Sequence, residues 1–283
     1  MNKLFLLSIL LVVLVSGCIN FGGASVAAFG ISETVDNPDI YLKIETSSDN
    51  VKSGRTMQVK VTLENRGQDS LDSINVTAYD MCLFEGDNEK HIDKLRSNRT
   101  NQWTWKWTAG DTQFERDCNI GFLTEYQTDA YISKTVNVLK ESEYYTRELQ
   151  QTLDEISVNE YSTGGSLKIT TEFSEPQPLL EGEDIYLYIK YEDIGNGILN
   201  QINAGDIIIS VPENLANGTC SGYMFDGTNF VLDQDLKFVN RKAPATSCKF
   251  TTAATQLIDS GEITITATYK YQFYNSLLLG VRP

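Results

Sequence analysis

The chain has 283 residues, a length that allows one or two domains with well-buried cores. It carries 23 Lys and Arg against 38 Asp and Glu, a formal net charge of −15, which excludes a typical nucleic-acid-binding protein because phosphate binding needs clustered basic side chains. The 41% share of hydrophobic residues excludes a disordered chain. The single histidine, His91, argues against catalytic triads and multi-histidine metal sites.

The first 17 residues have the pattern of an export signal. Lys3 precedes an apolar run over 4–15, which is shorter than the about 20 residues that a membrane-spanning helix needs. Residues 15–18, Val-Ser-Gly-Cys, resemble the lipobox of prokaryotic lipoproteins. The resemblance implies that a signal peptide over 1–17 is removed and that Cys18 carries the lipid. The alternative is an ordinary cleaved signal or short anchor with an unrelated cysteine.

Residues 18–38 are rich in Gly, Ala and Ser and have no strand pattern, which is typical of a flexible tether. An anionic chain suits attachment through a lipid better than attachment through basic contacts with acidic headgroups. We therefore expect the protein at the outer face of the cytoplasmic membrane, on the cell surface of an archaeon or bacterium. Its membrane contact would be the lipid on Cys18.

Alternating apolar and polar residues predict strands at 57–63, 74–78 and 263–273. Short strands separated by turns of Gly, Asn, Asp and Ser are typical of antiparallel β-sandwiches. A weak internal repeat supports two copies of one unit, because each of two glycine pairs encloses an alternating strand and is followed by another strand. The pairs are Gly54 with Gly67 and Gly182 with Gly195.

The expected fold class is therefore all-β, with two tandem Ig-like antiparallel β-sandwiches over 39–140 and 161–283. A helical linker at 141–160 would join them, since apolar residues there recur at helical spacing. The prediction is a solvated connector whose apolar stripe packs on a sandwich, and the alternative is a docking helix for a partner. The stripe consists of Tyr145, Leu149, Leu153 and Ile156.

If Cys18 carries lipid, four of the five cysteines remain, two in each expected sandwich. Four cysteines allow three pairings, and the domain boundary favours Cys82 with Cys118 and Cys220 with Cys248. Such pairs oxidise outside the cytoplasm. A four-cysteine zinc site is disfavoured because closely spaced CxxC pairs are missing from the sequence.

All three tryptophans lie at alternate positions of one expected strand, at Trp103, Trp105 and Trp107. A row of flat, amphipathic indoles on one strand face is a candidate binding surface for a sugar or a protein. The other interpretation, which we favour, is that the indoles fill the core between the two sheets, with one of them near the surface.

Three sequons are candidate N-glycosylation sites. Asn98 and Asn217 fall in sequence that is typical of loops, whereas Asn75 falls within an expected strand.

No motif predicts an enzyme, a cofactor or a metal site. The acidic stretches 85–89 and 226–235 do not follow the spacing of an EF-hand calcium loop. The chain has no GxSxG, P-loop or dinucleotide-binding glycine motif, and no carboxylate pair stands out as a glycosidase pair.

Residues 51–76 resemble the CARDB-type, or cell-adhesion-related, Ig-like domains of prokaryotic surface proteins. The resemblance rests on Gly54, Val59, Val61, Asn65 and Gly67, and the strand containing Trp105 and Trp107 fits a later aromatic strand of that family. It implies a spacer, adhesion or assembly role at the cell surface.

We therefore expect a lipid-anchored binding, adhesion or scaffolding module with a protein or glycan partner and no nucleic acid. The alternative is an accessory lipoprotein subunit of an envelope machine such as a transporter, a secretion system or a surface filament.

Overall fold

The computed structural model describes residues 32–283. The expected signal peptide, Cys18 and most of the expected tether lie outside the described residues. Within residues 32–283, no helix is both long and apolar enough to cross a membrane. The described chain is mostly β-structure with several antiparallel sheets and one α-helix, in agreement with the all-β prediction.

The single α-helix of the described chain is α2 (Glu141–Gln150), and a 3₁₀ turn follows at Leu153–Glu155. The strands, in chain order, are β1 (Ser32–Asp36), β2 (Ile40–Thr46), β3 (Asn50–Lys52), β4 (Thr56–Asn65), β5 (Leu71–Tyr79), β6 (Phe84–Gly86), β7 (Glu89–Leu95), β8 (Thr100–Ala109), β9 (Arg116–Leu139), β10 (Glu160–Ser162), β11 (Leu167–Phe173), β12 (Leu179–Leu180), β13 (Asp184–Asp193), β14 (Gln201–Ile202), β15 (Ile207–Ser210), β16 (Leu215–Cys220), β17 (Tyr223–Phe225), β18 (Asn229–Leu232), β19 (Leu236–Lys237), β20 (Thr246–Thr252) and β21 (Ile258–Arg282).

The strands form two larger and two smaller sheets. One has the order β1-β2-β4-β8-β6, and the largest has the order β17-β18-β15-β21-β9-β5-β7, with β10 and β12 added on β9 and β3 added on β21. A four-stranded sheet has the order β11-β13-β20-β16, and β14 pairs with β19. Among the described strands, only the pairings of β12 with β9 and of β3 with β21 are parallel.

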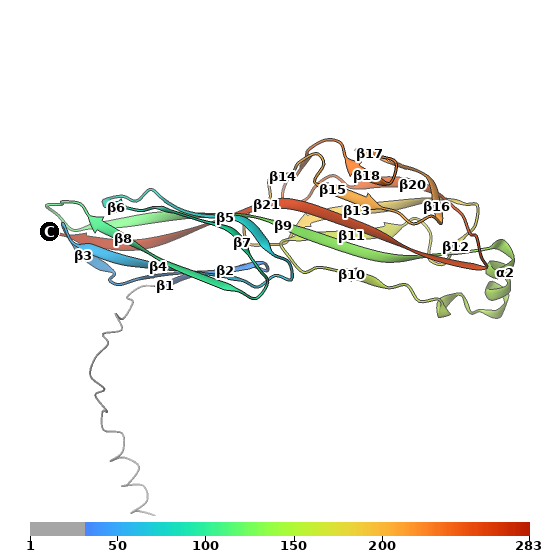
Figure 1. Ribbon diagram of the computed structural model, residues 1–283, viewed down its shortest axis with the longest axis horizontal. Coiled ribbons are helices and arrows are strands. Elements are labelled where there is room, and N and C mark those ends of the chain that lie inside the picture. Colours follow the sequence, from blue (N-terminus) through green and yellow to red (C-terminus); the bar gives the residue numbers. More distant parts are fainter. Residues whose placement is uncertain (1–31) are drawn as a thin grey trace, which may run out of the picture.

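Two long strands, β9 and β21, run through the whole molecule (Figure 1). They pair antiparallel from Ile258 opposite Leu139 to Val281 opposite Arg116. At about 3.3 Å per residue, such a two-stranded ribbon is roughly 80 Å long. Apolar side chains at every second position bury one face of the ribbon along most of this length.

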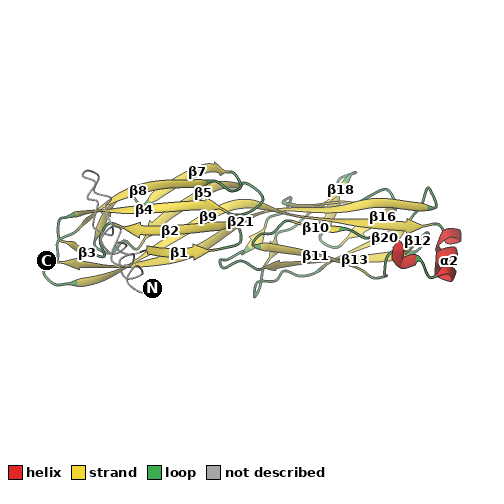
Figure 2. Ribbon diagram, turned by 90° about the horizontal axis from the view of Figure 1, so that it is seen from below, coloured by secondary structure: helices red, strands yellow, loops and turns green. Residues whose placement is uncertain are grey.

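The ribbon connects two lobes that lie end to end (Figure 2). In the first lobe the sheet containing β2, β4 and β8 packs over β5 and one end of the ribbon, and in the second lobe the sheet containing β13 and β20 packs over β15 and the other end. The buried apolar side chains of both lobes belong to one continuous cluster. We call the narrow region between the lobes, at about residues 126–130 of β9 and 267–271 of β21, the waist.

The prediction that a helix joins the two halves is wrong. The chain crosses from the first lobe to the second within β9, and α2 lies at the far end of the second lobe (Figure 1). The expected packing of its apolar stripe is also wrong, because α2 has no buried residue and Leu149 is 85% exposed. The helix ends at a left-handed Gln151, which separates Leu153 from the stripe and leaves too little apolar surface to dock.

The chain also returns to the first lobe at its C-terminal end. Residues 272–281 of β21 pair with residues 116–125 of β9, and Gly280–Arg282 pair with β3. The expected segments 39–140 and 161–283 therefore share strands rather than forming separate sheets. Ser32–Asp36, which were expected in the tether, form edge strand β1 on β2.

The internal repeat has a structural counterpart. Gly54 and Gly182 both adopt a positive φ, of 70° and 82°, two residues before the ten-residue strands β4 and β13. Each of these two strands ends on a buried residue whose side chain stabilises the turn that follows, and the stabilising hydrogen bond is of the same kind in both. The Oδ1 of Asn65 accepts a hydrogen bond from the amide of Gly67, and the Oδ1 of Asp193 accepts one from the amide of Gly195.

Two disulfides are present in the described chain, with the pairings that the sequence favours. Cys82–Cys118 ties the chain after β5 to the beginning of β9, and Cys220–Cys248 joins neighbouring positions of β16 and β20. Disulfides are typical of proteins outside the cytoplasm.

Candidate functional site

The tryptophan strand lies in the core and is not a binding face. Trp105 and Trp107 are fully buried, and their rings stack on each other and on Phe122. The indole N–H of Trp107 donates to the carbonyl of Asp87 at 2.7 Å. Trp103 is partly buried against the same core. Large aromatic side chains are needed here to fill the space between the two sheets.

The three candidate glycosylation sites have different surroundings. Asn98 is exposed in the turn before β8, and Asn217 is exposed at an irregularity in β16. Asn75 is partly buried on β5, and its Oδ1 lies 2.7 Å from Nδ1 of His91. Modification of these side chains stays a prediction.

A buried carboxylate in the first lobe holds one side of the waist. Asp39 lies just before β2, and its Oδ2 accepts hydrogen bonds from the Tyr126 hydroxyl and from the Ser166 amide, both at 3.0 Å. No cation pairs with Asp39 among the described residues. Burial therefore raises the pKa of the Asp39 carboxyl, although its hydrogen bonds act in the opposite direction.

A second buried carboxylate, at the end of β13, holds the other side of the waist. Asp193 accepts a hydrogen bond from the Tyr271 hydroxyl at 3.0 Å and lies 3.4 Å from the guanidinium of Arg241. The amide of Gly197 donates to the same tyrosine oxygen at 2.8 Å. Burial raises the pKa of the Tyr271 hydroxyl to about 12, so that this group remains a hydrogen-bond donor.

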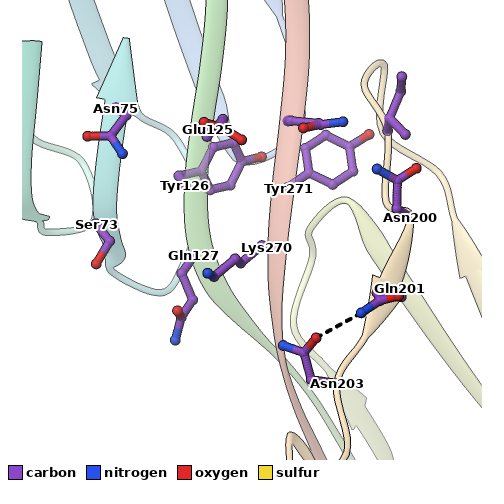
Figure 3. Close-up of a pocket in the computed structure, with 12 residues that line it drawn as sticks. Ser73, Asn75, Glu125, Tyr126, Gln127, Asn200, Gln201, Asn203, Lys270 and Tyr271 are labelled. Carbon is purple, nitrogen blue, oxygen red and sulfur yellow. Dashed lines mark hydrogen bonds between the residues drawn. The ribbon is translucent and has the colours of Figure 1, made fainter. Parts of the chain in front are cut away.

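A cavity of about 340 Å³ opens at the waist between the two lobes (Figure 3). We call it the waist pocket. Its wall on the first lobe is formed by β5, its floor by β9 and β21, and its wall on the second lobe by residues 198–203. Half of the lining residues have amide side chains, namely Asn75, Gln127, Asn200, Gln201, Asn203 and Gln272.

Strand register explains why these groups meet. Gln127 lies opposite Lys270, and Glu125 lies opposite Gln272, on the neighbouring strands β9 and β21. Asn75 of β5 is the next neighbour of Glu125. Because side chains two residues apart point to the same face of a strand, these groups share one face of the ribbon.

The chemistry of the waist pocket is that of polar recognition. Glu125 and Lys270 are the only charged side chains in its lining, and within residues 32–283 neither forms an ion pair. The lining contains hydrogen-bonding groups of several kinds but no histidine or cysteine. In the described part of the chain, no group of three or more His, Cys, Asp or Glu side chains is arranged to hold a metal ion.

The sequence alone pointed to only one residue of the waist pocket, Asn75. The others belong to strands whose polar positions look like ordinary solvent-facing positions. Three amides of the lining do cluster in the sequence, at Asn200, Gln201 and Asn203. That Gln127 and Gln272 lie on neighbouring strands of the same ribbon becomes known only from the register between β9 and β21.

Comparison with protein-family models gives no match, and comparison with curated proteins gives none either. The resemblance to CARDB-type domains therefore stays a prediction. Three similar solved structures all have low TM-scores, so they carry no argument about fold or function. They are a secreted serine protease, VesC, from Vibrio cholerae (9% identity, 80% of this chain and 49% of that chain, TM-score 0.22), a protein of unknown function from Porphyromonas gingivalis W83 (7%, 74% and 83%, 0.20) and red sea bream transglutaminase (9%, 86% and 31%, 0.21). The chain spans about half the length of the first of these.

Proposed function

We propose that this protein is a lipid-anchored, extracytoplasmic rod of two Ig-like β-sandwiches that acts as a non-catalytic binding, adhesion or scaffolding module. The observation that carries the proposal is the unbroken pairing of β9 with β21 through both lobes. Tandem domains usually meet at an exposed flexible linker. Here a hydrogen-bonded ribbon replaces the linker, which suits a protein that holds a binding surface at a fixed distance and orientation.

The energetics of the waist support a stiff rod. Bending it would break ladder hydrogen bonds of the ribbon and expose apolar side chains of the continuous core. It would also separate Asp39 from the amide of Ser166, a contact between residues 127 positions apart. A buried hydrogen-bonding group that loses its partner costs about 1–3 kcal/mol, so the straight arrangement is favoured.

Anchoring follows from the lipobox resemblance at Cys18. The described chain begins in the first lobe, with β1, whereas α2 lies at the opposite end of the molecule (Figure 1). A lipid at Cys18 would therefore attach the rod through its first lobe and present the second lobe and α2 away from the membrane.

Fractionation of cells that express the Cys18→Ser variant tests the anchor. The wild-type protein should stay with membranes and be extracted only by detergent, whereas Cys18→Ser should appear in the aqueous fraction. A matched control is Ser16→Ala, which keeps a small residue in the lipobox and should fractionate like the wild type. Membrane association of Cys18→Ser at the wild-type level would contradict the proposal.

A second candidate function is an accessory lipoprotein subunit of an envelope machine. The exposed apolar side chains of α2, above all Leu149, favour it because this end of the rod has apolar surface without a partner in the described chain. In that case the protein should co-purify from membranes with another envelope component at a fixed ratio, and Leu149→Ser should abolish the association. Unchanged co-purification of Leu149→Ser would exclude α2 as the contact.

A further inference from the structure

We propose that the waist pocket binds a neutral carbohydrate. The proposal rests on the binding role proposed above and identifies the ligand class and the residues that recognise it. Three properties of the pocket support it: the unused amide side chains, the balance of charge, and the combination of size with neighbouring aromatic surface.

The amide side chains match the chemistry of sugar hydroxyls. An amide offers both donors and an acceptor, as a hydroxyl does, so that each amide can form a cooperative pair of hydrogen bonds with a sugar. Gln127, Asn200 and Gln272 form no side-chain hydrogen bond with any described residue. Their donors and acceptors are therefore available to a ligand in the pocket.

Two further amides are held in place. The Nε2 of Gln201 donates to Oδ1 of Asn203 at 3.1 Å, the contact drawn in Figure 3. The Nδ2 of Asn203 in turn donates to Oδ2 of Asp206 at 3.0 Å. These contacts orient the wall on the second lobe before any ligand arrives, which lowers the entropy cost of binding.

The charges of the pocket favour a neutral ligand. Its single acid, Glu125, and single base, Lys270, lie on diagonal positions of β9 and β21, which are about 7–8 Å apart in an antiparallel pair. They do not neutralise each other, so Glu125 can accept and Lys270 can donate a hydrogen bond to ligand hydroxyls. The chain as a whole has a net charge of −15, which opposes the approach of anions.

The size of the pocket and its surroundings suit one or two sugar rings. Its volume of about 340 Å³ is at the lower end of small-molecule pockets, which are about 300–1,000 Å³. Tyr274 is two residues beyond Gln272 and therefore lies on the same face of β21, and its exposed ring contacts that of Tyr79 edge to face at 6.4 Å. An extended glycan could leave the pocket along this aromatic surface.

A zwitterion, such as an amino acid bracketed by Glu125 and Lys270, is the competing ligand. It would use the two charged groups but leave Gln127, Asn200 and Gln272 without a role. The amide-rich lining therefore favours the sugar, and the experiment below includes both ligand classes.

The test uses the full chain, produced in a host without N-glycosylation so that Asn75 is unmodified, and purified in detergent. Its binding is measured with an array of neutral, acidic and amino oligosaccharides and with free amino acids, and the best ligand is then titrated by calorimetry. We expect a neutral oligosaccharide to bind best. Gln127→Leu and Asn200→Leu should each weaken binding by about tenfold, the effect of one lost hydrogen-bonding group.

The matched control is Gln58→Leu, which changes an exposed strand amide on β4, outside the pocket. It should bind like the wild type. Circular dichroism of each variant establishes that the fold is intact. The proposal is overturned if no neutral oligosaccharide binds at millimolar concentration, if an amino acid or an anion binds best, or if both pocket variants keep wild-type affinity. None of these results affects the fractionation of Cys18→Ser, so failure of the sugar site and failure of the anchored rod are distinguishable.

Discussion

Tyr126 on β9 lies directly opposite Tyr271 on β21, and each hydroxyl donates a hydrogen bond to a buried carboxylate of a different lobe. The acceptor for Tyr126 is Asp39 in the first lobe, and the acceptor for Tyr271 is Asp193 in the second. The two ring centroids are 5.8 Å apart. One cross-strand pair of tyrosines therefore fixes the ribbon to both lobes at the waist.

The buried carboxyl of Asp39 should make stability depend on pH in a particular direction. Because burial raises its pKa above 3.8, the folded chain binds the proton more tightly than the unfolded chain. The stabilising contribution of the protonated group is complete below the unfolded pKa and is lost as the pH rises through the raised folded pKa. Asp39→Asn stays neutral, so its stability relative to the wild type should increase with pH over this window.

Urea unfolding of both proteins, followed by fluorescence from about pH 4 to about pH 8, measures this difference. The amide oxygen that Asp39→Asn introduces can still accept the hydrogen bonds of Tyr126 and Ser166, so the comparison isolates the charge. A constant difference in the free energy of unfolding at all pH values would show that the Asp39 charge carries no cost in the folded state.

Several features of the fold can be predicted from the sequence because they are local. The alternation in β4 and β13 and the glycines that precede these two strands are examples. The pairing of β9 with β21 is not local, because it joins residues as far apart as Arg116 and Val281. That pairing decides which lobe receives the C-terminal residues and brings the lining of the waist pocket together.

The position of α2 in the molecule also could not be predicted from local sequence. Helical spacing in 145–156 predicts a helix but does not tell where it lies in the molecule. The alternation over 120–132, which carries the chain through the waist as a strand, is also visible in the sequence. The alternation identifies β9 as a strand. That β9 connects the two lobes becomes known only once its partner strands are known.

The two disulfides should each stabilise the fold substantially. They close segments of 36 and 28 residues, for which loop-closure entropy predicts about 3–4 kcal/mol each. Replacement of Cys82 and Cys118 together by Ser should lower the free energy of unfolding by that amount, and so should replacement of Cys220 and Cys248. Urea unfolding measures both effects, and mass spectrometry of non-reduced peptides checks the pairing. A peptide that links Cys118 to Cys220 would contradict the structure.

The buried tryptophans should affect stability and not ligand binding. Trp105→Ala removes a fully buried indole and should cost about 3–5 kcal/mol. Trp103→Ala should cost less, because Trp103 is only partly buried. Thermal unfolding of both variants measures the difference. Equal small losses for the two residues would indicate that the Trp strand faces solvent.

The exposed helix should tolerate polar substitution. Leu149 is 85% exposed and makes no buried contact, so Leu149→Ser should change the free energy of unfolding by less than about 0.5 kcal/mol. Urea unfolding of the purified protein measures this change. A loss of about 2 kcal/mol or more would show that the apolar stripe packs on the second lobe after all.

The stiffness of the waist is the central claim, and a distance distribution across it is the most direct test. Spin labels would be attached through a non-natural amino acid at Thr104 on β8 and Lys168 on β11, two exposed positions in different lobes. Pulsed electron–electron double resonance on the full chain should give a single narrow distance distribution that matches the structure. A broad or multiple distribution would show that the lobes move independently and would contradict the rod.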